Sequence, residues 1–377
     1  MKVAAIGIGS NSVRMLVIEV EGTSFRRLRR DREGTRLFAG LDASRRLSEE
    51  SMHSTAAAVA RMAREAREEG AAQVHLFATS ATRDAANQAE FAALLRESAE
   101  VELEICSGEE EAALSFLGAT DGGYSGVIDI GGGSTEVVVG QGEQLVCAFS
   151  CQMGAVRLFR QIPITGHGDL PAAEAIAADI LERKLMLHPT LRLPEKWIGT
   201  GGTFTTLAAM VKGIHWTDRT YMHGTRLTLS QVEEKALLLS DMPMEERLHL
   251  PGLQPHRADI VVHGICILAS AMKRLGIEEM TVRQPGRLPE KALQPAGAGR
   301  RCSLNLHKKK QVSACHEAPP WGIIHEVTQI LQNRERSSDA QESAACVPAG
   351  CGPAAVRLRA DRKGHDCGPR HRGHPRG

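Results

Sequence analysis

Two apolar stretches near the N-terminus flank a short polar segment. Residues 2–8 (KVAAIGI) and 13–20 (VRMLVIEV) consist largely of strand-favouring side chains, and residues 9–12 (GSNS) are typical of a tight turn. The pattern predicts a β-hairpin. Residues 126–139 follow the same plan, with GVIDI, the turn GGGST and then EVVV. This repetition predicts an internal duplication with copies about 120 residues apart, each within a strand-rich α/β unit.

Helix-like and strand-like segments alternate along the rest of the first 282 residues. Between the two hairpins, helical spacing of apolar residues predicts a helix over 48–69 that ends at Gly70. The same reasoning predicts a strand over 74–78, a helix over 84–97 and a strand over 101–106. Beyond the second hairpin we expect helices over 172–186, 204–211 and 257–275, strands over 196–198 and from 280, and a glycine-rich turn over 199–203.

The periodicity is lost near residue 283, and the composition changes at the same place. Residues 283–377 contain 17 Lys or Arg against 8 Asp or Glu, and hold 9 of the 16 prolines and 5 of the 9 cysteines. Residues 1–282 contain 29 basic and 37 acidic residues, so the overall net charge of +1 describes neither part. We expect two α/β domains, over 1–118 and 119–282, and a basic, irregular tail over 283–377 that is disordered or foreign to the rest.

The overall balance of charge gives no sign of a dedicated nucleic-acid or membrane partner. Cys106, Cys147, Cys151 and Cys266 lack metal-ligand spacing and lie in apolar surroundings, which is typical of free thiols in a reducing compartment. The N-terminal apolar run is interrupted by polar residues and fits neither a signal peptide nor a membrane span. These features predict a cytoplasmic protein.

Three glycine-rich turns follow strand-like runs, and such turns offer backbone N–H groups to phosphate oxygens. One such turn alone is better explained as an ordinary hairpin, but three favour phosphate binding. The sequence contains neither a GxxxxGK[ST] motif nor the third glycine of a dinucleotide fingerprint, which excludes the two commonest phosphate loops. The candidate phosphate-binding residues are Gly9, Ser10, Asn11, Ser12, Gly131, Gly132, Gly133, Ser134, Thr135, Gly201, Gly202 and Thr203.

Asp129 is the most informative single residue, because it interrupts an apolar strand directly before the second glycine turn. A buried carboxylate there needs a cation or hydrogen-bond donors, and a metal-phosphate site supplies both. The alternative is a turn aspartate that accepts hydrogen bonds from nearby backbone N–H groups. By charge pattern alone, the acids of 109–111 are best explained as first-turn residues of a helix.

Basic residues gather over 26–30 (RRLRR), next to the first predicted hairpin. Two interpretations stay open for this run. It attracts a polyanionic substrate, or it protects an exposed strand edge from pairing with other chains.

Several segments, in order and spacing, resemble the exopolyphosphatase and guanosine pentaphosphate phosphohydrolase family. They are GSNSVRML, ATSATRDAAN, SGEEEAALSFLGA, VIDIGGGSTEVVVG, QMGAVRL, GTGGT and RADIVVHGICIL, and together they span residues 1–282. The wider actin, Hsp70 and sugar-kinase superfamily has two duplicated actin-like (ribonuclease H-like) α/β domains with the active site in the cleft between them. The resemblance therefore implies an α/β fold of this kind, with an interdomain active-site cleft.

The resemblance also implies roles for individual residues. Glu111 matches the family's catalytic glutamate, which orients or deprotonates the attacking water, and Arg83 matches an arginine near the phosphate chain. Asp129 matches a metal-linked aspartate, which implies Mg²⁺ as cofactor. The glycine turns then hold the terminal phosphate, and this set suits transfer of a phosphoryl group to water.

This chain departs from the family at two places. The family's first loop begins with an aspartate where this chain has Gly7, so one of two metal-linked carboxylates is missing and we expect weaker Mg²⁺ binding and slower hydrolysis. After Val282 the chain reads RQPGR in place of the family's continuation. The tail is either a displaced reading frame or an unrelated appendage.

We expect a phosphohydrolase that releases the terminal phosphate of inorganic polyphosphate or of pppGpp, and the family's habit implies a homodimer. The first alternative is a polyphosphate-binding or alarmone-binding protein with impaired catalysis. A superfamily kinase is the second alternative, and it is disfavoured because SGEEEA upstream of DIGGGST fits the hydrolases better.

Overall fold

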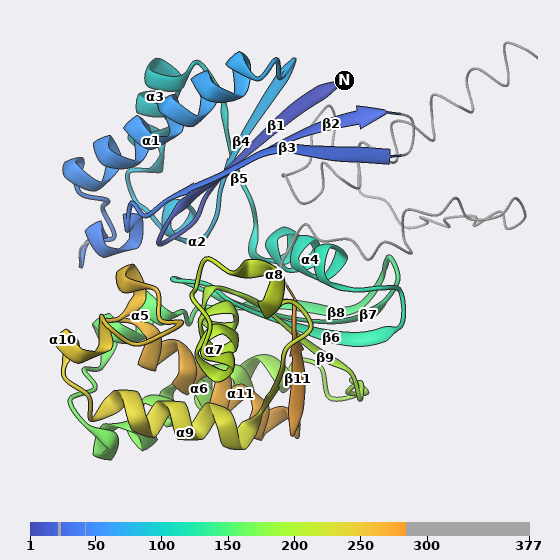
Figure 1. Ribbon diagram of the computed structural model, residues 1–377, viewed down its shortest axis with the longest axis vertical. Coiled ribbons are helices and arrows are strands. Elements are labelled where there is room, and N and C mark those ends of the chain that lie inside the picture. The colour runs from blue at the N-terminus through green and yellow to red at the C-terminus, as the bar shows by residue number, and fades with distance from the viewer. Residues whose placement is uncertain (22–23, 42, 284–377) are drawn as a thin grey trace, which may run out of the picture. The chain divides into compact units, whose positions relative to one another are not determined.

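The described part of the chain folds into two β-sheets that carry helices on their faces (Figure 1). The structure is a computed structural model and describes residues 1–21, 24–41 and 43–283. These residues belong to one compact unit. The tail predicted over 283–377 lies, apart from Arg283, outside the described residues.

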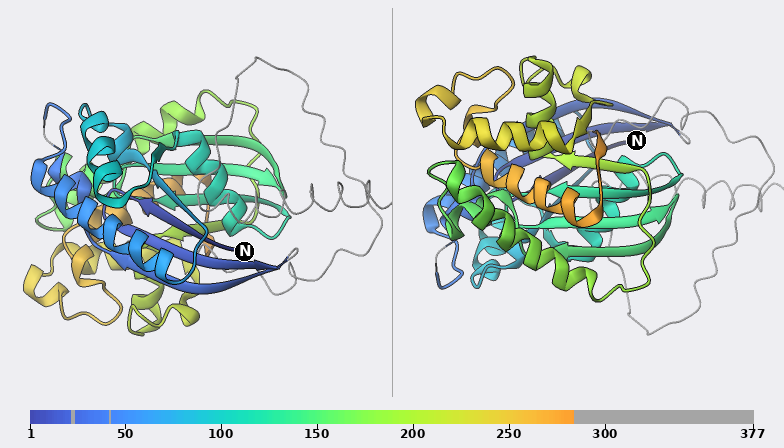
Figure 2. Two further views of the ribbon diagram at one scale, coloured as in Figure 1. Left: turned by 90° about the horizontal axis from the view of Figure 1, so that it is seen from above. Right: turned by 90° about the horizontal axis from the view of Figure 1, so that it is seen from below.

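The first sheet contains β1 (Lys2–Ile8), β2 (Val13–Glu21), β3 (Ser24–Glu33), β4 (Gln73–Ala78) and β5 (Leu103–Ile105), in the order β3-β2-β1-β4-β5. Its helices are α1 (Glu49–Glu68), α2 (Ser80–Arg83) and α3 (Gln88–Ala99), with a 3-10 helix η1 (Leu37–Gly40). Ser48 caps α1 by accepting a hydrogen bond from the backbone N–H of Ser51 at 3.2 Å. The apolar stripe of α1, including Val59 and Met62, packs against Ile6 and Val17, so α1 and α3 cover one face of the sheet (Figure 2).

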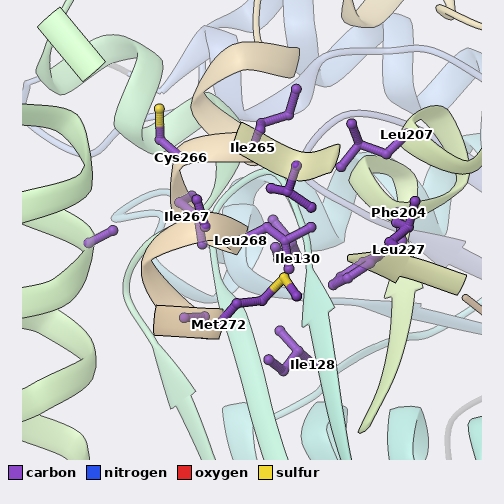
Figure 3. Packing of buried hydrophobic residues seen from close by; sticks show 14 of the residues in the cluster. Ile128, Ile130, Phe204, Leu207, Leu227, Ile265, Cys266, Ile267, Leu268 and Met272 are labelled. Carbon is purple, nitrogen blue, oxygen red and sulfur yellow. The ribbon is translucent and has the colours of Figure 1, made fainter. Parts of the chain in front are cut away.

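The second sheet contains β6 (Tyr124–Ile130), β7 (Thr135–Gln141), β8 (Gln144–Cys151), β9 (Trp197–Gly201), β10 (Arg226–Thr228) and β11 (Glu279–Val282), in the order β10-β11-β9-β6-β7-β8. Its helices are α4 (Gly108–Ala119), α5 (Ala155–Gln161), α6 (Leu170–Leu185), α7 (Gly202–Lys212), α8 (Arg219–Met222), α9 (Leu229–Ser240), α10 (Met244–Arg247) and α11 (Val261–Leu275), with 3-10 helices η2 (His167–Asp169) and η3 (Pro255–Arg257). Figure 3 shows the core on one face, where Leu268 and Met272 of α11 lie near Ile128 and Ile130 of β6.

The other face of the second sheet is covered by α4. Ala112 and Phe116 of α4 form a separate core cluster with Val127 and Val138 of the sheet. The helix that contains the predicted domain boundary at 118/119 therefore packs on the second sheet. The boundary itself stays a prediction.

The predicted duplication is visible in the strand pairing. β1 pairs antiparallel with β2 and parallel with β4, while β6 pairs antiparallel with β7 and parallel with β9. Both hairpins contain the turn that the sequence predicts. In each turn the first glycine donates its N–H to a serine carbonyl, Gly9 to Ser12 at 3.1 Å and Gly131 to Ser134 at 3.0 Å. The two halves thus build the same loop at the same edge of their sheets.

Some predicted elements differ from those observed. The helix predicted over 84–97 is replaced by α2 and α3, which are separated at 84–87. The turn predicted over 199–203 is wrong, because β9 continues to Gly201 and α7 begins at Gly202. The helix predicted over 257–275 begins as α11 only at Val261.

None of the helices among the described residues has the length and apolar character needed to cross a membrane.

Candidate active site

One cavity, with a volume of about 150 Å³, brings the three predicted glycine-rich segments together. It lies where β1 and β6 end, so residues from both halves of the chain face it. The apolar part of its wall comes from residues such as Phe77 and Leu114. The predicted site residues in its lining are Gly9, Ser10, Asn11, Ser12, Glu111, Asp129, Gly131, Gly132, Ser134, Gly201 and Gly202.

The first loop is held in place by its own carbonyl groups. The carbonyl of Ser10 accepts a hydrogen bond from the N–H of Phe38 at 2.9 Å, and that of Asn11 accepts one from the N–H of Arg36 at 3.2 Å. Asn11 is 6% exposed, and its Nδ2 has no partner among the described residues. A buried amide donor without an acceptor is costly, and an anion in the cavity would satisfy it.

The second loop uses its carbonyl groups in a similar way. The carbonyl of Gly131 accepts from the N–H of Ala155, and that of Gly132 from the N–H of Val156 at 2.8 Å. A Cβ on Gly132 would lie 2.8 Å from the Cβ of Ser10, so the second loop touches the first. Glycine is needed here because the two loops approach more closely than a side chain permits.

Four of the predicted residues lie outside the cavity lining. Gly133 packs against Ser80, and the Thr135 hydroxyl donates to the carbonyl of Met153 at 2.6 Å. Thr203 packs against Gly264 of α11. The fourth, Arg83, reaches the site through Glu111, to which its Nη1 donates at 3.2 Å.

Two consecutive acids at the start of α4 have different surroundings. Glu110 forms a capping box with Ser107, accepting the Ser107 N–H at 2.8 Å. Glu111 lines the cavity, and burial raises its pKa to about 7, with the charge of Arg83 opposing and that of Asp129 adding to the shift. The helix-stabilising interpretation of these acids therefore fits Glu110, while Glu111 is a buried carboxyl group in the cavity with a raised pKa, as is common among functional residues.

Asp129 lines the cavity at the end of β6, where burial raises its pKa above the usual range. Its Oδ2 accepts a hydrogen bond from the Ser115 hydroxyl at 2.7 Å. Glu136 of β7 pairs with Asp129 in the β6–β7 ladder. It is 1% exposed and accepts a hydrogen bond from the Ser150 hydroxyl at 2.8 Å. Burial, together with the charges of Glu111 and Asp129, raises the pKa of Glu136 well above its usual value. The charge of Asp129 thus acts on both glutamates, and that of Glu111 acts on Glu136.

A Mg²⁺ ion at these carboxyl groups would need further ligands from a substrate or water. Among the described residues, no group of three or more His, Cys, Asp or Glu could hold a metal ion. Mg²⁺ in phosphoryl-transfer sites is commonly bound by one or two carboxylates together with substrate phosphates and water. Asp129 offers such a carboxylate, and its burial favours a nearby cation.

Two arginines in the lining were not singled out from the sequence. Arg257 is 6% exposed, and burial, with a smaller effect from the charge of Arg14, lowers its pKa to about 9. Its Nε has no partner among the described residues, and its guanidinium lies against Gly202. The second arginine is Arg14, which also lines the cavity. Arg257 begins the segment RADIVVHG and Arg14 lies in GSNSVRML, so both belong to segments that carry the family resemblance.

A further basic wall comes from β3, which the sequence did not predict as a strand. Leu16 of β2 pairs with Arg30, but a register shift at Val17/Ile18 makes Ile18 pair with Arg27. This β-bulge turns Arg27 and Arg30 to the same face of the sheet, and both line the cavity. Since β3 is also the edge of the first sheet, both interpretations of the 26–30 run stay predictions.

The duplicated halves, their paired glycine loops and the shared cavity define a two-domain protein of the actin-like class. Residues 16–287 match the Ppx/GppA phosphatase family, and the chain belongs to this family. The resemblance seen in the sequence is therefore confirmed, as is the duplicated actin-like fold.

The relatives include proteins named for polyphosphate. The chain is 32% identical over 320 residues to Exopolyphosphatase 2 of Mycobacterium tuberculosis. The matched region covers 78% of this chain and 99% of the relative. A crystal structure of an exopolyphosphatase-like protein is 27% identical, with a TM-score of 0.69, covering 75% of this chain and 94% of that one. The PPX-GPPA enzyme of Aquifex aeolicus is 27% identical, with a TM-score of 0.63, covering 76% and 96%.

Proposed function

We propose that this chain releases the terminal phosphate of inorganic polyphosphate by attack of water. The observation that carries the proposal is the meeting of Glu111 and Asp129 with both glycine loops in one cavity. Loop N–H groups and the Asn11 amide bind the terminal phosphoryl group, and Arg14 and Arg257 balance its charge. The relative's name, exopolyphosphatase, supports this substrate class.

The residues around the cavity suggest how the reaction proceeds. Glu111, held by Arg83, accepts a proton from water as the water oxygen bonds to the terminal phosphorus. The anhydride bond to that phosphorus breaks, and the products are orthophosphate and a chain one unit shorter. Mg²⁺, when bound near Asp129, supplies charge that stabilises the phosphate oxygens. In-line placement of water and phosphoryl group by the loops accounts for much of the acceleration.

Three arginines in the cavity lining support polyphosphate as the substrate. Arg14, Arg27 and Arg30 line one side of the cavity, and a polyanionic chain beyond its terminal phosphate needs such a wall. pppGpp also ends in a phosphoanhydride and stays an alternative substrate. The second candidate function, a binding protein with impaired catalysis, is favoured by Gly7, which leaves the first loop without a carboxylate.

Phosphate release by the purified full chain tests these proposals. Polyphosphate and pppGpp are each supplied with Mg²⁺, using wild type, Glu111→Gln and Glu110→Gln. Release by wild type and Glu110→Gln, lost in Glu111→Gln, supports the hydrolase and identifies its substrate. Binding of either compound without release by any protein supports the impaired binding protein. ADP formed from ATP and a sugar would show a kinase instead.

A further inference from the structure

The internal duplication gives Asp129 a counterpart in the first half of the chain. In β6, Asp129 lies two residues before Gly131, the first residue of the second loop, and pairs with Glu136 of β7. In β1, Gly7 lies two residues before Gly9, the first residue of the first loop, and pairs with Arg14 of β2. At these equivalent positions the second half therefore has two carboxyl groups, whereas the first half has a glycine paired with Arg14.

Phe77 fills the space that a side chain at position 7 would occupy. It pairs with Gly7 across the parallel β1–β4 ladder and is 6% exposed. A Cβ on Gly7 would lie 3.0 Å from Cε2 and 3.1 Å from Cε1 of Phe77, and closer still to Cζ. Real Cβ atoms avoid such distances, so a carboxylate here requires the ring to move.

The cavity that contains the Asp129 carboxyl group also contains positive charge from both halves. Arg14 of the first half and Arg257 of the second half line it together with Asp129. A bare divalent cation at Asp129 would share this cavity with like charges. A phosphate chain offsets this, because its oxygens bring negative charge and also supply ligands to the cation.

We infer that Gly7 and Phe77 together make the metal site dependent on substrate, so that the divalent cation enters as its polyphosphate complex and does not bind first. Phe77 fills the space beside Gly7, so the first half presents no carboxylate at this place. This inference rests on the proposed polyphosphate hydrolysis.

Binding of Mn²⁺ in the absence of phosphate tests the inference directly. Mn²⁺ prefers the same oxygen ligands as Mg²⁺ and is counted by electron paramagnetic resonance. The informative variant is the double substitution Gly7→Asp with Phe77→Ala, which adds a carboxylate and gives it room. Its matched control, Gly7→Asn with Phe77→Ala, has the same shape without the charge.

We expect wild type and the Asn control to bind Mn²⁺ weakly, and the Asp variant to bind it roughly tenfold or more tightly. Circular dichroism and thermal melting establish that each variant is folded. If wild type binds Mn²⁺ as tightly as the Asp variant, or if the Asp and Asn variants do not differ, the inference is wrong.

A second measurement addresses the substrate side. Immobilised polyphosphate is presented to Glu111→Gln proteins, so that no turnover occurs, with Mn²⁺ or with EDTA. With Gly7 and Phe77 intact, Mn²⁺ should strengthen binding to polyphosphate; equal binding in EDTA would overturn the inference. Failure of the wild-type chain to release phosphate would reject the proposed function, whereas the Mn²⁺ results would stand independently of it.

Discussion

Glu110 and Glu111 show how one residue of offset separates two roles. Glu110 completes the cap of α4 through Ser107, and Glu111 enters the cavity beside Arg83. Nothing in the local charge pattern distinguishes them, because all three acids of the first turn suit a helix N-terminus. The distinction arises from which side of α4 faces the second half of the chain.

Activity should rise with pH as Glu111 loses its proton. Its pKa is raised to about 7, so the carboxylate that accepts the proton is scarce at pH 5.5 and prevalent at pH 8. We expect kcat/KM to climb through about pH 7 and Glu111→Gln to lower kcat by roughly 10²- to 10⁴-fold. The pH profiles of wild type and Glu110→Gln serve as the comparison. If the Glu110→Gln enzyme also loses the rise of kcat/KM near pH 7, the attribution of this rise to Glu111 is wrong.

Gly202 leaves room for the guanidinium of Arg257. A Cβ at position 202 would overlap that guanidinium, so Gly202→Ala should displace Arg257 from the cavity. We expect the KM for polyphosphate to rise about tenfold, which corresponds to one lost charge-assisted contact. Steady-state kinetics measure the change.

The matched control for this substitution is Gly118→Ala in α4. A Cβ at position 118 meets nothing within 4 Å, so the variant should keep the wild-type KM and gain up to about 1 kcal/mol of stability. Equal KM values for wild type and Gly202→Ala would show that Arg257 does not contribute to binding.

At the scale of elements, β3 is a strand that is hard to recognise from the sequence because most of its residues are charged. Its sequence SFRRLRRDRE lacks the apolar alternation by which strands are recognised, because partners outside the strand compensate its charges. Arg61 of α1 donates to Asp31 and Glu33 of β3 and to Glu65 of its own helix, at 2.8 to 2.9 Å. This cluster attaches the edge strand to α1.

Loss of Arg61 should loosen β3. In Arg61→Met the three carboxylates lose their shared cation, and we expect a loss of about 1 kcal/mol in the free energy of unfolding, smaller at high salt. Amide hydrogen exchange should accelerate along β3. Urea titration and exchange measurements check both effects.

Arg26→Met is the control for this variant, because Arg26 forms an exposed pair with Glu19. We expect no measurable change in the free energy of unfolding for it. If Arg61→Met leaves exchange along β3 at the wild-type rate, the cluster does not attach the strand.

The sequence predicted the elements that have regular apolar periods, and it missed those positioned by partners distant in the chain. α1 and the two hairpins were recognised because their buried faces follow the helical or strand period. The turn expected over 199–203 was wrong because Gly201 adopts a positive φ of 95° and joins β9 to α7 without a loop. The cavity wall from Arg27 and Arg30 depended on a β-bulge, which leaves no periodic signal.

At the scale of the whole described molecule, ion pairs and hydrogen bonds join the two halves around the cavity. Arg157 of α5 pairs with Asp84, which follows α2, and donates to the carbonyl of Gly133 at 2.7 Å. Arg36 pairs with Asp259, and Arg32 donates to the side chain of Gln254 at 2.9 Å. Each contact joins residues near a glycine loop, so the arrangement of the loops depends on them.

Asp84→Asn should weaken this connection without touching the cavity. We expect kcat to fall by about tenfold, because loop displacement of even 1 Å is costly for in-line transfer, while the KM changes less. The melting temperature should fall by a few degrees. Arg183→Met, which breaks an exposed pair within α6, is the control and should leave kcat unchanged. An Asp84→Asn enzyme with full kcat would show that this pair does not order the loops.

The contact between the Gly132 loop and Ser10 has a consequence for how the protein matures. The two loops are more than a hundred residues apart in the chain, and neither can complete the cavity without the other. Such distant contacts form late in folding, after local hairpins and helices. During synthesis the first half is completed while the second is still being made, but it acquires no catalytic site until the partner loop arrives. Catalytic competence therefore reports the completion of folding.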